Sequence, residues 1–354
     1  MRALPTGFLL HPAAALHDAG WGHPDHQGRL GALASAVSMD MLTLHERVVQ
    51  LEARSATEEE LLPVHTQEHV ERVRSAVDRA MEEERCIPLN LDTLVSGGSW
   101  DAAVGSSGAV LVAVDGVARG FVRNAFVATR PPGHHATPAR AMGFCLFNHV
   151  AVGARYVLDQ GLGRKVLIVD WDVHHGNGTQ EVFYRDPNVF YLSLHQSPHY
   201  PGTGQEWETG AEAGSGTTLN IPLPPGTPRD EYRERFFGVL EDVWGDFAPD
   251  WVFVSCGFDV LKGDPLGGQE LEPVDLYDFT RAVVALSVPT QGPPVALAGS
   301  TGGAAGPENV SAAGDPGTPT GMRTVLVLEG GYVPELIGAG TVAVLRALAG
   351  LAAP

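Results

Sequence analysis

Basic residues are scarce in this sequence. Its 354 residues include 23 lysines and arginines against 42 aspartates and glutamates, a formal net charge of −19. A protein that binds nucleic acid needs clustered cationic side chains to displace the counterions of the phosphates, and the sequence contains no such cluster. The charge therefore argues against a nucleic-acid partner. It would attract cationic partners such as lysine-rich tails or polyamines, and it also favours solubility.

Cysteines and long apolar runs are scarce as well. Cys86, Cys145 and Cys256 are widely spaced and form no CxxC pair, which excludes a disulfide framework and a thiolate zinc site and favours a reducing compartment. No run reaches 18 apolar residues, and the N-terminus lacks the apolar region and cleavage site of a signal peptide. We therefore expect a cytoplasmic protein without membrane association.

What the sequence does contain is enough apolar material for a large core, with 44% hydrophobic and 18% charged residues. Five short, continuous apolar runs are typical of fully buried strands. They are Ala125–Thr129, Lys165–Val169, Val189–Leu192, Trp251–Val254 and Thr324–Leu328. Segments with helical periodicity lie at Ser99–Val117, Phe144–Gln160, Arg229–Trp244, Val274–Leu286 and Pro334–Leu351. This alternation predicts an α/β fold with a mostly parallel sheet covered by helices on both faces.

One segment interrupts the pattern. Residues 289–321 consist mainly of Gly, Pro, Ala, Ser and Thr without periodicity, which predicts a flexible insertion. Only one strand and one helix follow it, so it does not link two domains. It leads into the amino end of the last strand, and we expect a surface excursion on the face opposite the active site. The prediction is one domain over residues 1–354 that carries this insertion.

Polar clusters follow all five predicted strands. Their sequences are RPPGHH at 130–135, DWDVHHGNGTQ at 170–180, SLHQSPHYPGTG at 193–204, SCGFD at 255–259 and LEGGY at 328–332. In open α/β sheets, ligands bind in the crevice at the carboxyl ends of the strands. The clusters therefore predict one active site at that edge of the sheet.

Asp172 and His174 are candidate metal ligands. They are two residues apart in an extended segment, so their side chains point to the same side. Asp259, at the end of another strand, completes a set of two carboxylates and one imidazole, which suits a catalytic zinc with open positions. Iron(II) or cobalt would accept the same set. Alternatively, Asp172 and His174 form only a hydrogen-bonded cap on the following turn.

The adjacent pair His134 and His135 is a candidate for proton transfer, because imidazole titrates near neutral pH. Asp170 and Asn177 in the neighbouring loop are available to orient the two rings. Tyr332 follows two glycines and could donate its hydroxyl to a developing oxyanion. The alternatives are a pair of surface histidines and a tyrosine that packs on the end of a strand.

These segments, together with GFCLFN at 143–148 and GFDVLKGDPLGG at 257–268, resemble the zinc-dependent histone deacetylase superfamily. This superfamily includes bacterial deacetylase-like amidohydrolases and acetylpolyamine amidohydrolases, and the class II branch is most similar. The resemblance extends from about His11 to Gly350, apart from the insertion. It implies an arginase-like α/β fold and a hydrolase that removes acetyl or other acyl groups from lysine side chains.

The resemblance also implies roles for particular residues. His135 would be the main base and acid beside His134, with Asp170 behind His134 and Asn177 behind His135, while Tyr332 would polarise the carbonyl. The remaining assignments are the following. The zinc ligands are Asp172, His174 and Asp259; the substrate tunnel and rim contain Gly143, Phe144, Tyr200, Leu266 and Asp92; and Arg29 lies below the pocket.

Structural potassium is a further implication of the resemblance. The first ion would bind the backbone carbonyls of Asp170, Asp172, His174 and Leu194 and the hydroxyl of Ser193, and a second would lie near Phe183, Asp186 and Val189. Tyr200 departs from the family pattern, which usually has Phe at this position. The apolar Leu266 favours an acyl-lysine over a free polyamine, because a carboxylate there would bind the polyamine cation.

Three other functions compete with this one. An acetylpolyamine or small-molecule amidohydrolase would use the same chemistry on another substrate. A non-catalytic module that only binds acyl-lysine would have lost a ligand, the histidine pair or the tyrosine, and all of these residues are present. A binuclear manganese ureohydrolase would need further carboxylates, but His175-Gly176 and Val260-Leu261 follow the candidate ligands instead.

Overall fold

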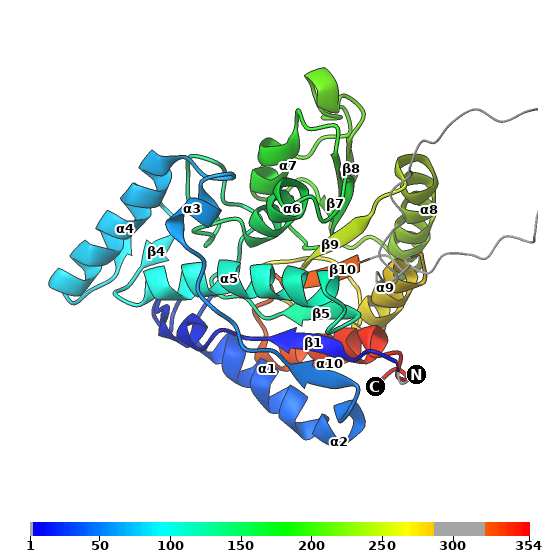
Figure 1. The fold of residues 1–354 in the computed structure, drawn as a ribbon, viewed down its shortest axis with the longest axis horizontal. Coiled ribbons are helices and arrows are strands. Elements are labelled where there is room, and N and C mark those ends of the chain that lie inside the picture. Colours follow the sequence, from blue (N-terminus) through cyan, green and yellow to red (C-terminus); the bar gives the residue numbers. More distant parts are fainter. Residues whose placement is uncertain (1–2, 287–322) are drawn as a thin grey trace, which may run out of the picture.

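An eight-stranded, entirely parallel sheet runs through the centre of the protein (Figure 1). This computed structural model describes residues 3–286 and 323–354. In spatial order the strands are β2 (Val48–Gln50), β1 (Thr6–Leu9), β5 (Asn124–Val127), β10 (Arg323–Leu328), β9 (Trp251–Cys256), β6 (Val166–Asp170), β7 (Val189–Gln196) and β8 (Thr218–Leu223). The predicted α/β fold with a parallel sheet is confirmed.

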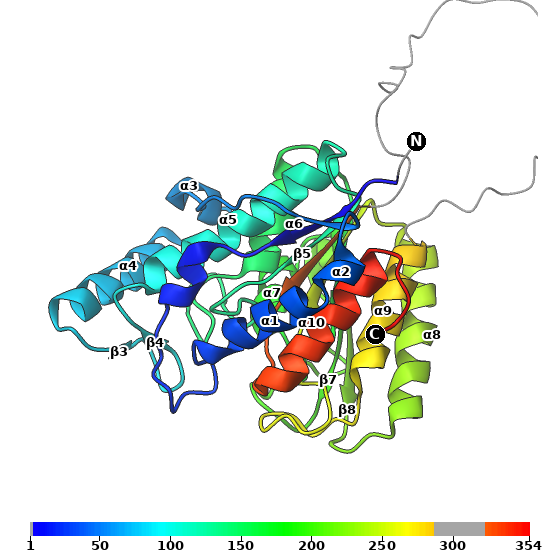
Figure 2. The same cartoon turned by 90° about the horizontal axis from the view of Figure 1, so that it is seen from below.

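Helices cover both faces of this sheet (Figure 2). The longer ones are α1 (Gly28–Met39), α4 (Gln67–Glu82), α5 (Ser99–Ala118), α6 (His149–Asp159), α8 (Arg229–Phe247), α9 (Pro273–Leu286) and α10 (Pro334–Leu348). The shorter ones are α2 (Met41–Leu44), α3 (Glu58–Leu61) and α7 (Asn177–Phe183), with 3-10 turns at Pro12–Leu16 and Glu212–Gly214. A separate antiparallel pair, β3 (Ile87–Pro88) and β4 (Leu94–Val95), lies outside the main sheet.

Alternating side chains of the strands divide the core into two layers. In β9, Trp251 and Phe253 point to the layer beneath α4, α5 and α6, while Val252 and Val254 point to the layer beneath α1, α8, α9 and α10. Continuous apolar strands have this property because both of their faces are buried. Within the described residues, α5 is the one helix with the length and composition of a membrane span, and 78% of its apolar stretch is buried in the protein, as in a core helix.

The predicted elements are present, but several boundaries differ. The helix expected from Phe144 begins at His149, because Phe144 has a φ of 69° and the Asn148 side chain caps the helix by accepting the N–H of Ala151. β7 continues to Gln196, and the last helix ends at Leu348. The strands β1, β2 and β8 were not predicted. The insertion expected at 289–321 lies outside the described residues, so the single domain with this insertion stays a prediction.

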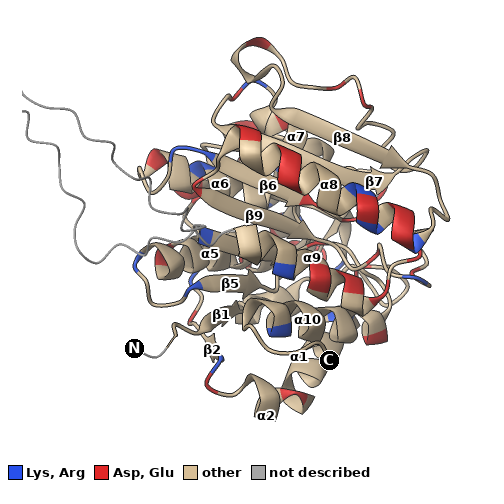
Figure 3. Cartoon of the chain, turned by 90° about the vertical axis from the view of Figure 1, so that its right-hand side faces the viewer, with Lys and Arg blue, Asp and Glu red and all other residues tan. Residues whose placement is uncertain are grey.

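Charged side chains lie mainly on the outer helices. Figure 3 shows acidic residues along α8, all of them exposed, in keeping with the net charge of −19. The carboxyl ends of the strands carry a different kind of polar group. Most of the polar residues there are buried, and they include several histidines.

Two of these buried histidines form hydrogen bonds to loops near the carboxyl edge, and each does so in a single protonation state. His65 donates from Nδ1 to the carbonyl of Thr137 (3.1 Å) and accepts the N–H of Asn148 at Nε2 (2.9 Å). His149 bonds the Ser107 hydroxyl at Nδ1 (2.8 Å) and donates from Nε2 to the carbonyl of Pro131 (3.1 Å). Burial lowers the pKa of His65 to about 3 and that of His149 to about 4. Both rings are therefore neutral in the folded protein.

We expect thermal stability to fall as the pH drops from about 6.5 toward 4. The unfolded chain takes up protons on these histidines below pH 6.5 and the folded chain does not, so each should cost about 2 kcal/mol at pH 5. The measurement is the melting temperature between pH 7.5 and pH 5. His65→Gln should make the melting temperature depend less on pH, because the amide does not titrate. His45→Gln replaces an exposed histidine and should not have this effect. Equal slopes for all three proteins would contradict the assignment.

Candidate metal centre and active site

The three candidate metal ligands lie together at the carboxyl edge of the sheet. Asp172 and His174 follow β6, and Asp259 follows the neighbouring strand β9. Their possible ligand atoms are all within 4.8 Å of one another, and all three residues are buried. His174 Nδ1 lies 3.0 Å from Asp172 Oδ1 and 3.3 Å from Asp259 Oδ2. No other such group of acidic, histidine or cysteine side chains occurs in the described residues.

Hydrogen bonds from the backbone orient the two carboxylates. Gly330 N–H donates to Asp172 Oδ2 (2.8 Å), and Val173 N–H donates to Asp259 Oδ1 (3.0 Å). His174 N–H also donates to Asp172 Oδ1 (2.9 Å), so the cap that was the alternative explanation exists beside the cluster. The glycine at 330 is required, because a Cβ there would lie 1.9 Å from Asp259 Oδ2.

A divalent cation fits this cluster. Asp259 Oδ2 is buried and has no hydrogen-bond partner, which is costly for a carboxylate oxygen. Burial and then the charge of Asp172 raise the pKa of Asp259, because two buried carboxylates repel each other. A cation would remove both penalties. Two carboxylates and one imidazole are also the donors that a catalytic zinc with open positions accepts.

The histidine pair is buried beside the cluster, so it is not a surface pair. The rings of His134 and His135 are 4.1 Å apart between centroids. His134 Nδ1 lies 3.0 Å from Asp170 Oδ2, and His135 Nδ1 lies 2.9 Å from Asn177 Oδ1. These are the partners expected from the sequence. The hydroxyl of Tyr191 donates to the same oxygen of Asp170 (3.0 Å).

The two rings differ in charge because their partners differ. Burial lowers the pKa of His134, but the charges of Asp170 and Asp172 outweigh it and raise the pKa to about 10. Burial and then the positive charge of His134 hold the pKa of His135 well below its usual range. The result is one charged and one neutral imidazole side by side. Since the amide oxygen of Asn177 can only accept, His135 carries its proton on Nδ1 and has a free lone pair on Nε2.

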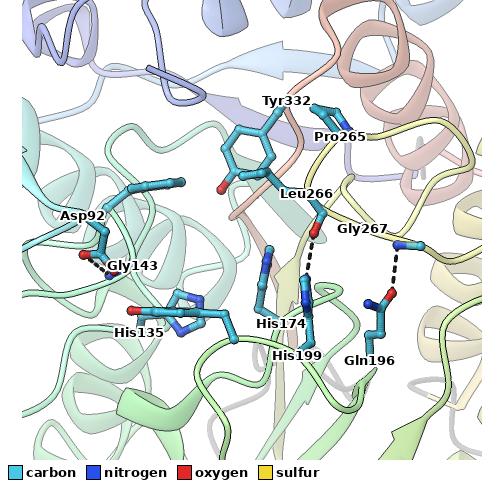
Figure 4. A pocket seen from close by; sticks show the side chains of 13 residues that line it. Asp92, His135, Gly143, His174, Gln196, His199, Pro265, Leu266, Gly267 and Tyr332 are labelled. Carbon is cyan, nitrogen blue, oxygen red and sulfur yellow. Dashed lines mark hydrogen bonds between the residues drawn. The ribbon is translucent and has the colours of Figure 1, made fainter. Parts of the chain in front are cut away.

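Tyr332 lies across the cavity from His135, with its hydroxyl pointing into the cavity (Figure 4). Burial raises the pKa of this phenol well above its usual range, so the hydroxyl remains a hydrogen-bond donor. The turn before it is held by Arg29, which donates to the carbonyls of Gly331 and Glu329 at 2.6 Å each. The guanidinium of Arg29 is 5.0 Å from the centroid of the Tyr332 ring.

The cavity between these groups has a volume of about 460 Å³. All five residues expected at the tunnel or rim line it: Asp92, Gly143, Phe144, Tyr200 and Leu266. The Tyr200 ring is perpendicular to that of His135 at 5.1 Å, and the Phe144 ring is nearly perpendicular to that of Tyr332 at 5.9 Å. Asp92 accepts the N–H of Gly143 at 3.1 Å. The aromatic rings form the walls of a passage that leads to the metal cluster.

Several residues of the site were not predicted. His199 stacks on His174 at 4.8 Å and donates to the carbonyl of Leu266 (2.8 Å), while Gln196 accepts the N–H of Gly268 (2.8 Å). The buried carboxylate of Glu329 accepts the N–H groups of Gly133 (2.7 Å) and His134 (3.1 Å). All three residues could have been found from the sequence, because they lie in the polar clusters that follow the strands.

The residues expected around the first potassium ion also lie at this edge. Asp170 and Ser193 are partners in the register of β6 and β7, and Gln196 N–H donates to the carbonyl of Val173 (2.8 Å). The positions Phe183, Asp186 and Val189 share one turn, in which Asp186 N–H donates to the carbonyl of Phe183 (3.0 Å). Potassium binding at either place stays a prediction.

Comparisons with known proteins agree with this geometry. The histone deacetylase domain family matches residues 23–306. The chain belongs to the histone deacetylase family. It is 36% identical over 282 residues to a probable deacetylase of Archaeoglobus fulgidus, and this alignment covers 80% of this chain and 77% of the relative. It is 40% identical over 253 residues to histone deacetylase HDA1 of Saccharomyces cerevisiae, which covers 69% of this chain and 36% of the relative.

The fold agrees as well. The crystal structure of the HDA15 HD domain superposes with a TM-score of 0.82 at 33% identity, covering 99% of this chain and 89% of that one. The resemblance inferred from the motifs and the enzyme class, a deacetylase and thus a hydrolase, are confirmed. Several plant, fungal and human histone deacetylases are much longer, and the chain spans only 31% to 53% of their length.

We expect removal of the metal to lower stability, because it leaves two buried carboxylates in repulsion. A chelator should lower the melting temperature by several degrees, and Zn²⁺ should restore it. The melting temperature of the Asp259→Asn variant should change with neither the chelator nor Zn²⁺. The control is Asp250→Asn, at the opposite end of β9, which should keep the zinc response. A wild-type melting temperature that neither chelator nor zinc changes would contradict a metal site.

Proposed function

We propose that this chain is a zinc-dependent amide hydrolase that removes acetyl or other acyl groups from lysine side chains. The observation that carries the proposal is the arrangement at the base of the cavity. The buried cluster of Asp172, His174 and Asp259 lies between a charged and a neutral histidine on one side and the Tyr332 hydroxyl on the other. We also propose structural potassium at the two places described above.

Zinc would be held by Asp172, His174 and Asp259, and when bound it supplies a Lewis acid that polarises the amide carbonyl and lowers the pKa of a water. Iron(II) or cobalt would suit the same donors. Tyr332 donates its hydroxyl to the carbonyl oxygen as negative charge develops there. His134, held positive by Asp170, adds a fixed positive charge close to the reacting atoms.

His135 acts as the base and then as the acid. Its Nε2 lone pair takes a proton from the attacking water as the new C–O bond forms. It returns that proton to the lysine nitrogen as the C–N bond breaks, which releases the carboxylic acid and the amine; the acid then gives up its proton, so the products are a carboxylate and an ammonium. Asn177 keeps the ring in the required tautomer through Nδ1–H, so the base does not need to rearrange between the two steps.

The walls of the cavity favour an acyl-lysine substrate. Phe144 and Tyr200 enclose an apolar passage suited to the lysine methylenes, and Leu266 at the rim offers no carboxylate to a free polyamine. The net charge of −19 would raise the encounter rate with cationic peptides at low salt. It would do the same for an acetylpolyamine, which remains the second candidate. Three free cysteines support the cytoplasm as the proposed location.

We expect Tyr332→Phe to lower kcat by about 10²- to 10³-fold on an acetyl-lysine peptide, because the transition state loses one hydrogen-bond donor. His135→Ala should lower kcat by at least 10²-fold through loss of the base. Tyr277→Phe is the control, since its hydroxyl bonds the carbonyl of Leu351 far from the cavity. Full activity in either site variant, with an unchanged melting temperature, would overturn the mechanism.

The substrate is tested by comparing kcat/KM for an acetyl-lysine peptide, a longer-chain acyl-lysine peptide and acetylspermidine. We expect kcat/KM to be higher for the acetyl-lysine peptide than for acetylspermidine, because the rim residue Leu266 is apolar, where a carboxylate would bind the polyamine cation. A preference for acetylspermidine above about tenfold, roughly 1.4 kcal/mol of transition-state discrimination, would replace the first candidate with the second. Lack of hydrolysis with zinc, iron(II) and cobalt would favour a module that only binds acyl-lysine.

A further inference from the structure

A second cavity, of about 360 Å³, lies beside the mouth of the active-site cavity. The two share a wall, because Asp92 and Tyr200 line both of them. The other sides of this rim pocket come from α4, from the turn between β3 and β4, and from residues 140–142. It uses none of the metal ligands or proton-transfer residues.

The rim pocket is positively charged in a strongly acidic protein. Arg72 and Arg140 both line it, against one carboxylate, that of Asp92. In the described part of the chain neither arginine forms an ion pair, unlike Arg74 with Glu58 or Arg155 with Asp186. Arg72 donates from Nη1 to the carbonyl of Ala139 (3.1 Å), which holds its guanidinium and leaves its other N–H groups available. An unpaired guanidinium binds a carboxylate through two parallel hydrogen bonds.

The wall of the pocket next to the active site is fixed in place. The side-chain oxygen of Asn90 accepts the N–H groups of Asp92 (3.0 Å) and Thr93 (2.9 Å), and its amide donates to the carbonyl of Ala141. The Thr93 hydroxyl in turn donates to Asp92 Oδ1 (2.7 Å). These hydrogen bonds fix the conformation of the turn, and the Asp92 carboxylate already accepts hydrogen bonds on the side that faces the active site. Preorganised walls reduce the cost of binding.

Apolar side chains complete the pocket. Val73, Leu89 and Met142 line it, and the fully exposed Leu91 forms its edge. A ligand with a short aliphatic chain that ends in a carboxylate would match both the apolar walls and the two arginines. A polyamine would not, because its ammonium groups would face two guanidinium ions of the same sign.

We propose that the rim pocket binds the carboxylate side chain of an acidic residue that flanks the acyl-lysine in a peptide substrate. This inference rests on the proposed deacylation of lysine. An extended peptide advances about 3.5 Å per residue, so a residue one or two positions from the lysine reaches across the shared wall. The pocket would thus select peptides over polyamines, and among peptides those with Glu or Asp near the lysine.

The test uses matched acetyl-lysine peptides that carry Glu or Gln at each of the two positions before and after the lysine. At one of these positions we expect kcat/KM for the Glu peptide to exceed that for the Gln peptide about fivefold, mainly through KM, since two exposed ion pairs each contribute modestly. The preference should shrink at 0.5 M NaCl because both arginines are exposed. The double variant Arg72→Gln/Arg140→Gln should remove it.

The control is Arg79→Gln, which removes one positive charge from the helix that carries Arg72, two turns away and outside the pocket. It should keep the preference for Glu. Hydrolysis of both peptides at equal rates at every position, or a preference that survives the double variant, would overturn the rim pocket while leaving the deacylase intact. If wild type hydrolyses no acetyl-lysine peptide, the proposed function fails, and the rim pocket fails with it.

Discussion

A buried ion cluster beneath the carboxyl edge of the sheet supports the whole active site. Asp25 lies between Arg29 and Arg130, at 2.6 Å and 3.2 Å, and all three side chains are almost completely buried. Burial would raise the pKa of Asp25, but the two arginines outweigh it and keep this carboxyl ionised. Buried charges are costly unless they are paired, and Asp25 Oδ2, 3.6 Å from His17 Nε2, has no hydrogen-bond partner. Here the remaining N–H groups of the arginines find backbone carbonyls, so the cluster joins segments that are distant in the sequence.

Those segments carry the groups that we propose act in catalysis. Arg130 begins the loop that leads to the histidine pair, and it donates to the carbonyls of His17 (2.6 Å) and Asp25 (2.7 Å). Arg29 holds the turn that leads to Tyr332. The opposite walls of the active site thus share one electrostatic support. Close approach then depends on glycine, because a Cβ at Gly257 would lie 2.3 Å from Asp172 Oδ2.

Much of this could be predicted from the sequence, because the informative residues are local. Continuous apolar runs identified the central strands, which are buried on both faces, and the polar residues directly after them identified the metal cluster and the histidine pair. The strands that escaped prediction lie at the two sides of the sheet: β1 and β2 have only four and three residues, and the edge strand β8 contains Pro222, which a central strand would not tolerate. The start of α6 depends on the left-handed backbone of Phe144, which a helical pattern does not reveal.

The residues missed at the site act through tertiary contacts. Glu329 and His199 stood within the polar clusters, but their functions follow from partners that are distant in the chain, the N–H groups of residues 133 and 134 and the carbonyl of Leu266. Asp25 had no signal, since a single acidic residue in an N-terminal loop resembles many others. Sequence patterns predict which polar residues follow a strand, but they do not predict which distant residues pack beneath them.

The small β3–β4 pair has a consequence for how such an enzyme can diversify. It lies outside the main sheet, and with α4 it builds one flank of the entrance, whereas every group assigned to bond cleavage projects from the ends of the central strands. Selectivity and reactivity therefore reside on separately encoded pieces of the chain. Substitutions, insertions or deletions in that flank can change the substrate preference while the groups assigned to bond cleavage stay in place. Such modularity allows the same reaction to be applied to many substrates.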